Sequence, residues 1–418
     1  MSEHEDLIAV PPPPANLAPE EIVVANPPSR RPAAYVAIVV GLIAMVGGAV
    51  FFSRSLGSNE GGADTPVAAV QRMFDALSDQ DALGVLETLL PSERDQLRGP
   101  LQDITRELGR IGILSKDLDL GSISGIELNF TGLKFATDQI APGVNTVTLE
   151  AGTSTYTIDP AHSPLGSFVR GLLPAEARNV IKGNDDLSKD EAAFTTIKEG
   201  DKWFVSLWYS VAEAARVDAK APVPDFGNGL AARGADTPEA AVEQFIRAAV
   251  LLDVRRLIEL TPPEEARALH DYAPLFIDAA EAGAREARKA YDAEVSKLVL
   301  TGRVDGNRAL VKIGDLAFSA RVPELGMSID FDGTCATVAG GFFGTGAPIR
   351  QCNKGLGSVA GVPNVPTPDM GFVAVREGGK WYVSPTGTIL DGMLAVLNVL
   401  EPSHLEMFKQ IFGGFAGG

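Results

Sequence analysis

The amino-acid sequence predicts an α+β protein in which two tandem units follow one N-terminal transmembrane helix. Three observations lead to this prediction. Residues 62–97 and 234–269 match without a gap at 14 of 36 positions, so the chain contains a duplication. In each unit the hydrophobic spacing changes from a helical period to the period of two that is typical of strands. Residues 32–52 form a run without a charged side chain.

Length and charge limit the classes of protein that fit. A chain of 418 residues has room for two or three domains, and the duplication favours two. The formal net charge of −18 argues against a nucleic-acid partner, because phosphate binding needs clustered Lys and Arg side chains. The acidic balance is typical of a solvated outer surface.

The N-terminal residues 1–31 are rich in proline, with four consecutive prolines from Pro11, and should form a disordered cytoplasmic tail. Such a tail is either solvated or a docking segment for a proline-recognising domain. Residues 32–53 are expected to span the membrane, since the apolar run crosses a hydrocarbon core of about 30 Å. About 30 residues precede this run, unlike a cleaved signal peptide. The run therefore predicts a retained single-pass anchor, followed by a linker at 54–61.

The flanking charges predict the orientation of this anchor. Arg30 and Arg31 precede it and only Arg54 follows closely, so the positive-inside rule leaves the N-terminus in the cytoplasm and the bulk of the chain extracytoplasmic, at the cell membrane. Small residues share one face of the predicted span: Ala37, Gly41, Ala44 and Gly48. This face would allow a homodimer, although Gly and Ala are also common in membrane helices without such a role.

The units are predicted at residues 62–216 and 234–412, and each should begin with three helices. Thr65 and Thr237 precede prolines and are expected to cap the first helix of each unit. Asp81 and Asp253 should begin a second, short helix. A third follows, marked in the first unit by apolar residues from Leu97 to Ile111.

The rest of each unit should form an antiparallel sheet. Alternating apolar residues flank turns at Pro142-Gly143 in the first unit and Asp305-Gly306 in the second. A closing hairpin turns near Gly200 in one unit and near Gly378 in the other. Residues 217–233 are predicted to link the units. The apolar stretch 389–400 is expected to form a helix that packs on the second unit, and residues 413–418 form a flexible tail.

Only two cysteines occur, Cys335 and Cys352, both on the side that the anchor assigns to an oxidising compartment. We therefore expect a disulfide between them. Four scattered histidines and the absence of metal-binding or phosphate-binding motifs predict neither a metal nor a cofactor. His270-Asp271 could in principle transfer protons, but we expect an exposed histidine at a helix end instead.

The order of these motifs resembles the NTF2-like superfamily, especially membrane-anchored or lipoprotein forms of actinobacteria. The resemblance rests on the Asp-Thr-Pro openings, on the acidic starts of the second helices, and on the closing Gly-x-Lys-Trp-(Phe/Tyr)-Val hairpins at 200–205 and 378–383. It covers most of residues 62–400 and implies tandem cone-shaped domains, in which helices and a curved sheet enclose a cavity. Members include isomerases, ligand-binding proteins and scaffolds, so the resemblance implies a fold rather than a function.

Four aromatic residues are candidates for ligand binding. Trp203 and Trp381 recur at equivalent positions and are either core anchors or cavity-lining residues. Trp208 and Tyr209 have no aromatic counterparts in the second unit. We expect a non-enzymatic binding or scaffolding protein of the bacterial cell envelope, whose partner is an envelope protein or an apolar small molecule. The alternative is an isomerase-type enzyme or carrier acting on a lipid or another apolar small molecule.

Overall fold

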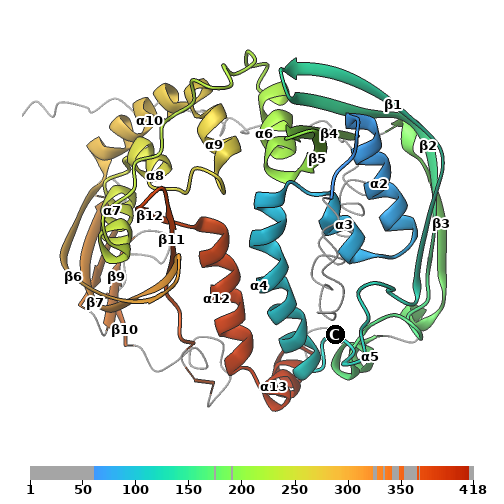
Figure 1. Ribbon diagram of the computed structural model, residues 1–418. Helices are drawn as coiled ribbons and strands as arrows, with labels where there is room; N and C mark the ends of the chain where they lie inside the picture. Colours follow the sequence, from blue (N-terminus) through green and yellow to red (C-terminus); the bar gives the residue numbers. More distant parts are fainter. Residues whose placement is uncertain are drawn as a thin grey trace, which may run out of the picture.

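The computed structural model describes residues 61–413, except 174–175, 190–191, 323–326, 333–334, 341–347, 353–364 and 367. It is an α+β fold with two curled antiparallel sheets, one from each half of the chain. In Figure 1 the sheets form the two outer flanks, and α4 and α12 lie side by side between them. The predicted N-terminal tail (1–31) and transmembrane helix (32–53) with its small-residue face lie outside the described residues, as do all but the last residue of the linker (54–61) and all but the first residue of the C-terminal tail (413–418).

The first half begins with α2 (Pro66–Ser78), α3 (Ala82–Thr88) and α4 (Pro91–Arg110). Thr65 and Asp81 cap α2 and α3, as predicted, because each side chain accepts a hydrogen bond from a backbone N–H in the first turn. Two strands, β1 (Ile126–Ala141) and β2 (Val144–Ile158), follow as a long hairpin.

The first sheet is completed by three shorter strands and followed by a helix. These elements are α5 (Ser167–Leu172), β3 (Ile181–Asp186), β4 (Ala192–Glu199), β5 (Lys202–Ser206) and α6 (Leu207–Asp218), with short 3₁₀ turns at 176–178 and 187–189. The strand order is β1-β2-β4-β5, and β3 pairs with the far end of β2.

The second half repeats this order with additions. Its helices are α7 (Pro238–Val250), α8 (Val254–Glu259), α9 (Arg267–Tyr272), a 3₁₀ turn at 273–275 called η3, and α10 (Ile277–Ala290). Its strands are β6 (Asp292–Asp305), β7 (Arg308–Val322), β8 (Met327–Phe331), β9 (Cys335–Ala339), β10 (Ile349–Cys352), β11 (Phe372–Glu377) and β12 (Lys380–Val383). The helices α12 (Pro385–Val399) and α13 (Pro402–Gly413) follow.

The two sheets share one pairing scheme. In each, a long second strand pairs with the first strand along its length, with the closing hairpin near one end and with a short strand near the other. The two halves also share an unusual backbone conformation between their first two helices. Gln80 and Leu252 both adopt a positive φ there, at 56° and 52°, which is uncommon for residues other than glycine.

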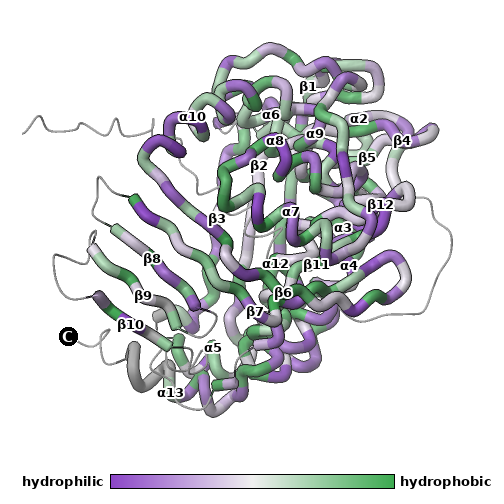
Figure 2. The backbone as a smooth tube through the Cα atoms, turned by 90° about the vertical axis from the view of Figure 1, so that its left-hand side faces the viewer, coloured by the Kyte–Doolittle hydropathy of each residue, from purple (hydrophilic) through white to green (hydrophobic). Residues whose placement is uncertain are grey.

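The second sheet also has β9 and β10, which have no equivalent among the described residues of the first half. Figure 2 shows β7, β8, β9 and β10 side by side with the second half toward the viewer. Cys335 and Cys352 are directly opposite each other on β9 and β10 and form the predicted disulfide.

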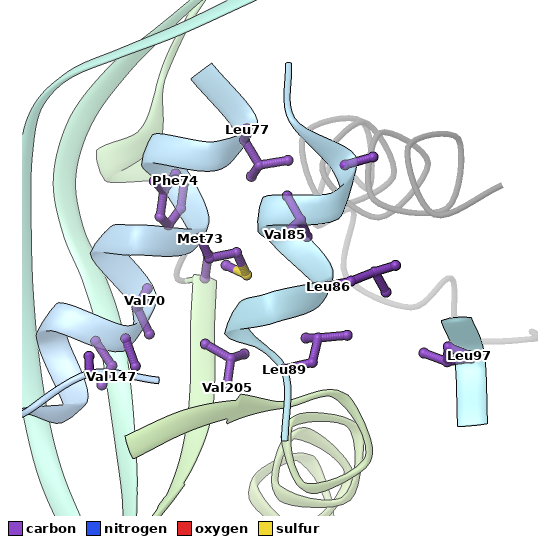
Figure 3. Close-up of a cluster of buried hydrophobic side chains, with 14 of the residues drawn as sticks. Val70, Met73, Phe74, Leu77, Val85, Leu86, Leu89, Leu97, Val147 and Val205 are labelled. Atoms are coloured by element: carbon purple, nitrogen blue, oxygen red, sulfur yellow. The ribbon is translucent and has the colours of Figure 1, made fainter. Parts of the chain in front are cut away.

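The concave side of the first sheet is filled by side chains of α2 and α3 (Figure 3). Phe74 is 1% exposed and contacts the rings of Phe130, Phe135 and Phe194 at centroid distances of 4.9, 5.9 and 5.8 Å. Edge-to-face aromatic contacts of this kind add to the free energy of burial. The core of this half is thus built around one apolar face of its first helix.

One prediction about packing was wrong. The stretch 389–400 forms most of α12, but this helix packs mainly on α4 of the first half rather than within its own half. Leu390 contacts the hydrophobic core of the first half. Within the part of the chain that the structure describes, no helix has the length and apolar character needed to cross a membrane.

Candidate functional site

In each half, a buried glutamate from an earlier segment lies at the N-terminus of the helix that follows the last strand. Glu93 of α4 accepts hydrogen bonds from the Ser206 hydroxyl and from the backbone N–H of Leu207, the latter at 2.7 Å. Glu265, at the matching position in the second half, accepts from the backbone N–H of Thr386 at 3.0 Å. A carboxylate at a helix N-terminus satisfies N–H groups that lack a partner within the helix. These two contacts fix where α6 and α12 begin.

Once positioned, α6 packs on α9 of the other half through two reciprocal hydrogen bonds. The Tyr209 hydroxyl of α6 donates to Asp271, and the Tyr272 hydroxyl of α9 donates to Glu213 of α6 at 2.8 Å. Arg216 adds two charge-assisted hydrogen bonds to Glu213, at 2.8 and 2.6 Å. Each helix therefore supplies one tyrosine and one carboxylate to this interface between the halves.

The segment that joins the halves completes this interface. The Phe226 ring contacts the rings of Tyr209 and Tyr272, with centroids 6.2 and 5.7 Å away, and the two tyrosine rings contact each other at 6.1 Å. The two tyrosines are 3% and 4% exposed and belong to one hydrophobic cluster that spans both halves. The connecting segment is thus part of the packed interface.

Burial sets the protonation of the paired groups. It raises the pKa of Tyr209 and of Tyr272 far above the ordinary phenol value, and the hydrogen bonds to Asp271 and Glu213 raise it further. Burial also raises the pKa of Asp271, while the bond from Tyr209 and the nearby Arg267 lower it. The tyrosines therefore remain neutral donors at physiological pH.

A groove of about 560 Å³ opens beside this interface, between the two halves. One wall is a face of α6, formed by Trp208, Val211, Ala212, Ala215, Arg216 and Ala219. The facing wall comes from α9, η3 and the residues next to them, and includes Ala266, Leu269, Tyr272, Leu275 and Phe276. Pro385 and Thr386, at the start of α12, also line it.

Several large apolar side chains of the groove are exposed to solvent. Val211 is 64% exposed and Trp208 is 40% exposed, and Leu269 and Phe276 are similar to Trp208. Contiguous exposed apolar surface of this kind is typical of a binding site. Volumes of roughly 300–1,000 Å³ are usual for sites of small ligands, and the groove falls within that range.

The four aromatic candidates from the sequence lie in different surroundings. Trp208 lines the groove, and Tyr209 lies next to it in the buried interface. Trp203 packs against the core of the first half, and Trp381 is buried in the core of the second. Their backbones make the same antiparallel bridge, to Ala63 and to Ala235. The structure therefore places the recurrent tryptophans in the cores and away from the groove.

The expectation of an exposed His270 was wrong. Its ring is buried, with Nδ1 2.8 Å from the Leu230 carbonyl oxygen and Nε2 3.1 Å from the Thr261 hydroxyl. Asp271 points away from this histidine's partners, to Tyr209. His270 therefore holds the connecting segment against α9, and the two adjacent side chains bond to different partners.

Sequence reasoning missed most of the groove, including Leu269, Tyr272 and Phe276. The helical spacing of Trp208, Val211, Ala215 and Ala219 was a readable signal for one wall. The partner of that face lies in the other half, and nothing in the local sequence identifies it.

In the described parts of the chain, no group of three or more His, Cys, Asp or Glu side chains is arranged to hold a metal ion. No family model, no curated protein and no solved structure matches the chain in the three comparisons with known proteins. The geometry of the groove is therefore the basis for assigning a function.

Proposed function

We propose that this chain is a membrane-anchored, extracytoplasmic binding protein of the bacterial envelope, without catalytic activity, that holds an apolar component of the envelope in the groove between its two halves. The observation that carries the proposal is the groove itself, with its almost entirely apolar lining and its exposed Val211 and Trp208. Burying such surface against a ligand is favourable by roughly 25 cal/mol per Å².

The polar groups near the groove favour binding over chemistry. Glu213 is engaged by both Arg216 and Tyr272, and Glu265 accepts the N–H of Thr386. A general base must reach a proton of the substrate, whereas these carboxylates already have partners within the protein. Their contacts support a structural role.

The parts of this proposal that concern the cellular location and the fold family rest mainly on the sequence. The disulfide between Cys335 and Cys352 supports an oxidising compartment, and the apolar run at 32–53 supports an anchor whose N-terminus is cytoplasmic. The repeated order of helices followed by a curled sheet supports the proposal that the halves are tandem NTF2-like domains.

A pair of matched valines on α6 allows a direct test. Val211 lines the groove, whereas Val217 is 58% exposed on the opposite face of the helix. A photo-crosslinking amino acid would replace each valine in the full chain in native membranes, and the adducts would be identified by mass spectrometry. We expect an adduct from position 211 that Ala215→Trp removes, and none from position 217. Absence of an adduct at 211, or equal adducts at both positions, would contradict the proposal.

The second candidate function is an isomerase-type enzyme acting on an apolar small molecule. One observation favours it, because Tyr272 lines the groove and its hydroxyl is bonded to the carboxylate of Glu213. Tyr272→Phe separates the two functions. A catalytic hydroxyl would be indispensable for turnover, whereas a binding protein should keep its Val211 adduct in this variant.

A further inference from the structure

We propose that the ligand of the groove is a single-chain amphiphile, with its hydrocarbon chain along α6 and an oxygen-bearing head group at Arg216. This inference rests on the proposed binding function and specifies its ligand. It follows from the shape of the groove, the chemistry of its walls and the unused hydrogen-bond donors of Arg216.

The groove is elongated along one helix. Trp208, Val211 and Ala215 follow one another on a single face of α6, the C-cap residue Ala219 continues this face, and all four line the groove. At 1.5 Å per residue this face is about 16 Å long. A site of this length suits an extended hydrocarbon chain better than a compact ring system.

The walls of the groove are formed mainly by apolar side chains, which make van der Waals contacts but few hydrogen bonds. Six alanines line the groove: Ala212, Ala215, Ala219, Ala221, Ala266 and Ala268. Small side chains leave a smooth surface, and the larger Leu269, Leu275 and Phe276 close it from the other half. Contacts of this kind are non-directional and scale with area, which suits methylene groups.

Arg216 provides the polar end. A guanidinium group has five N–H donors, and three of them bond to Glu213 and to the Ala221 carbonyl oxygen. Two N–H groups therefore have no acceptor among the described residues. Arg216 lies near the Ala219–Ala221 end of the groove, since its Nη1 is 2.7 Å from the Ala221 oxygen. An oxygen of a carboxylate head group could accept from these donors.

The same donors disfavour an apolar helix of a partner protein as the occupant. The carbonyl oxygens within a helix are bonded to its own N–H groups, so a packed helix would cover Arg216 without supplying an acceptor. Leaving buried donors without partners costs roughly 1–3 kcal/mol. A long-chain carboxylate covers the apolar walls and also supplies the acceptor.

The test uses two photoactivatable probes that differ only in their head group. One is a long-chain fatty acid with a diazirine in the chain, and the other is the corresponding alkane. Each is added to the full chain in bilayers, and labelled peptides are mapped by mass spectrometry. We expect the fatty acid to label α6 and α9, and the alkane to label them about tenfold less.

Two adjacent alanines of α6 provide the matched variants. Ala215 lines the groove, whereas Ala214 is exposed and does not. Ala215→Trp should remove most of the labelling, and Ala214→Trp should leave it unchanged. Excess unlabelled fatty acid should compete with the probe, whereas the two-chain phospholipid of the bilayer should not.

Three results would overturn the inference. They are equal labelling by the alkane, equal labelling of the two tryptophan variants, and competition by the phospholipid. A protein adduct at Val211 without labelling by the fatty acid would also reject the amphiphile, while leaving the binding function intact. Absence of both the adduct and the labelling would reject both proposals.

Discussion

Glu93 shows how a single buried side chain organises the start of a helix. It is 3% exposed and accepts hydrogen bonds from Ser206, Leu207 and Trp208. Burial raises the pKa of Glu93 above its ordinary value, although these three hydrogen bonds lower it. The folded state therefore binds a proton more tightly at this site than the unfolded chain does. Its contribution to stability is greatest at low pH and is lost as the pH rises through the folded pKa.

The raised pKa of Glu93 predicts how the Glu93→Gln substitution changes the pH dependence of stability. Relative to the variant, the wild-type protein should gain free energy of unfolding when the pH is lowered from 7 to 5, because only the wild type takes up a proton at this site. Urea unfolding of the full chain at both pH values measures the difference. Ser206→Ala is the control, since it keeps the carboxylate and should keep the pH dependence. A wild type that loses stability relative to Glu93→Gln on acidification would show that its pKa is not raised.

At the scale of elements, the contact between α12 and α4 depends on Arg110. Its Nη2 donates to the carbonyl oxygens of Leu397 and Leu400, both at 2.8 Å. These oxygens lie at the end of α12, where the Leu397 oxygen accepts one further hydrogen bond from the N–H of Leu400. A cation there also complements the negative end of the helix dipole. Arg110 thus joins α12 of the second half to α4, the third helix of the first half.

Arg110→Leu should therefore lower the free energy of unfolding by about 1–3 kcal/mol, through loss of two charge-assisted hydrogen bonds. Arg106 lies one turn earlier on α4 and pairs with Asp103, with the two side chains 56% and 43% exposed. Arg106→Leu should cost less than about 0.5 kcal/mol, because such surface pairs contribute little. Chemical denaturation of both variants provides the comparison, and equal losses would contradict the role assigned to Arg110.

The disulfide between β9 and β10 gives a second prediction at this scale. Replacing Cys335 and Cys352 together by alanine should destabilise the second half by about 3 kcal/mol in the chain-entropy description of loop closure. The wild type measured under reducing conditions should match the variant. If reductant leaves the midpoint of unfolding unchanged, the disulfide contributes no stability to the measured transition.

Local chemistry explains which elements the sequence could predict. Thr65 and Asp81 cap helices through contacts within four residues, and Gly306 allows a hairpin turn through its own positive φ of 58°. The partner of α12 depends on contacts with residues almost 300 positions away, such as Arg110 with Leu397. His270 was misjudged for the same reason, because its burial depends on the connecting segment.

For the whole molecule, the two halves exchange contacts through the helices that follow their closing hairpins. The last helix of the first half, α6, packs on α9, and α12 packs on α4, the matching partner in the first half (Figure 1). The groove lies within this arrangement, so neither half contains it alone. The duplication predicted two similar units, but Trp208 was the only groove residue singled out. Trp208 was informative about the groove because the second half has no aromatic residue at the matching position, whereas the motifs shared by both halves indicated only the fold.

The connecting segment should therefore control whether the halves unfold together. The Phe226 ring packs against Tyr209 and Tyr272, one from each half, and these two rings also contact each other. Phe226→Ala removes this partly buried ring from the interface and should cost roughly 1–3 kcal/mol, less than the loss of a fully buried phenylalanine. Because the loss falls on the contact between the halves, we expect one thermal transition for the wild type and a broader or split transition for the variant.

Val223 provides the matched control for this experiment, because it belongs to the same segment but is 49% exposed. Val223→Ala should leave one transition at nearly the wild-type temperature, as surface substitutions usually do. Calorimetry of the full chain distinguishes the outcomes, since halves that unfold separately give a calorimetric enthalpy larger than the van't Hoff enthalpy. A Phe226→Ala protein that keeps one sharp, two-state transition would mean that other contacts couple the halves. Its groove, which depends on that coupling, should then still give the Val211 adduct.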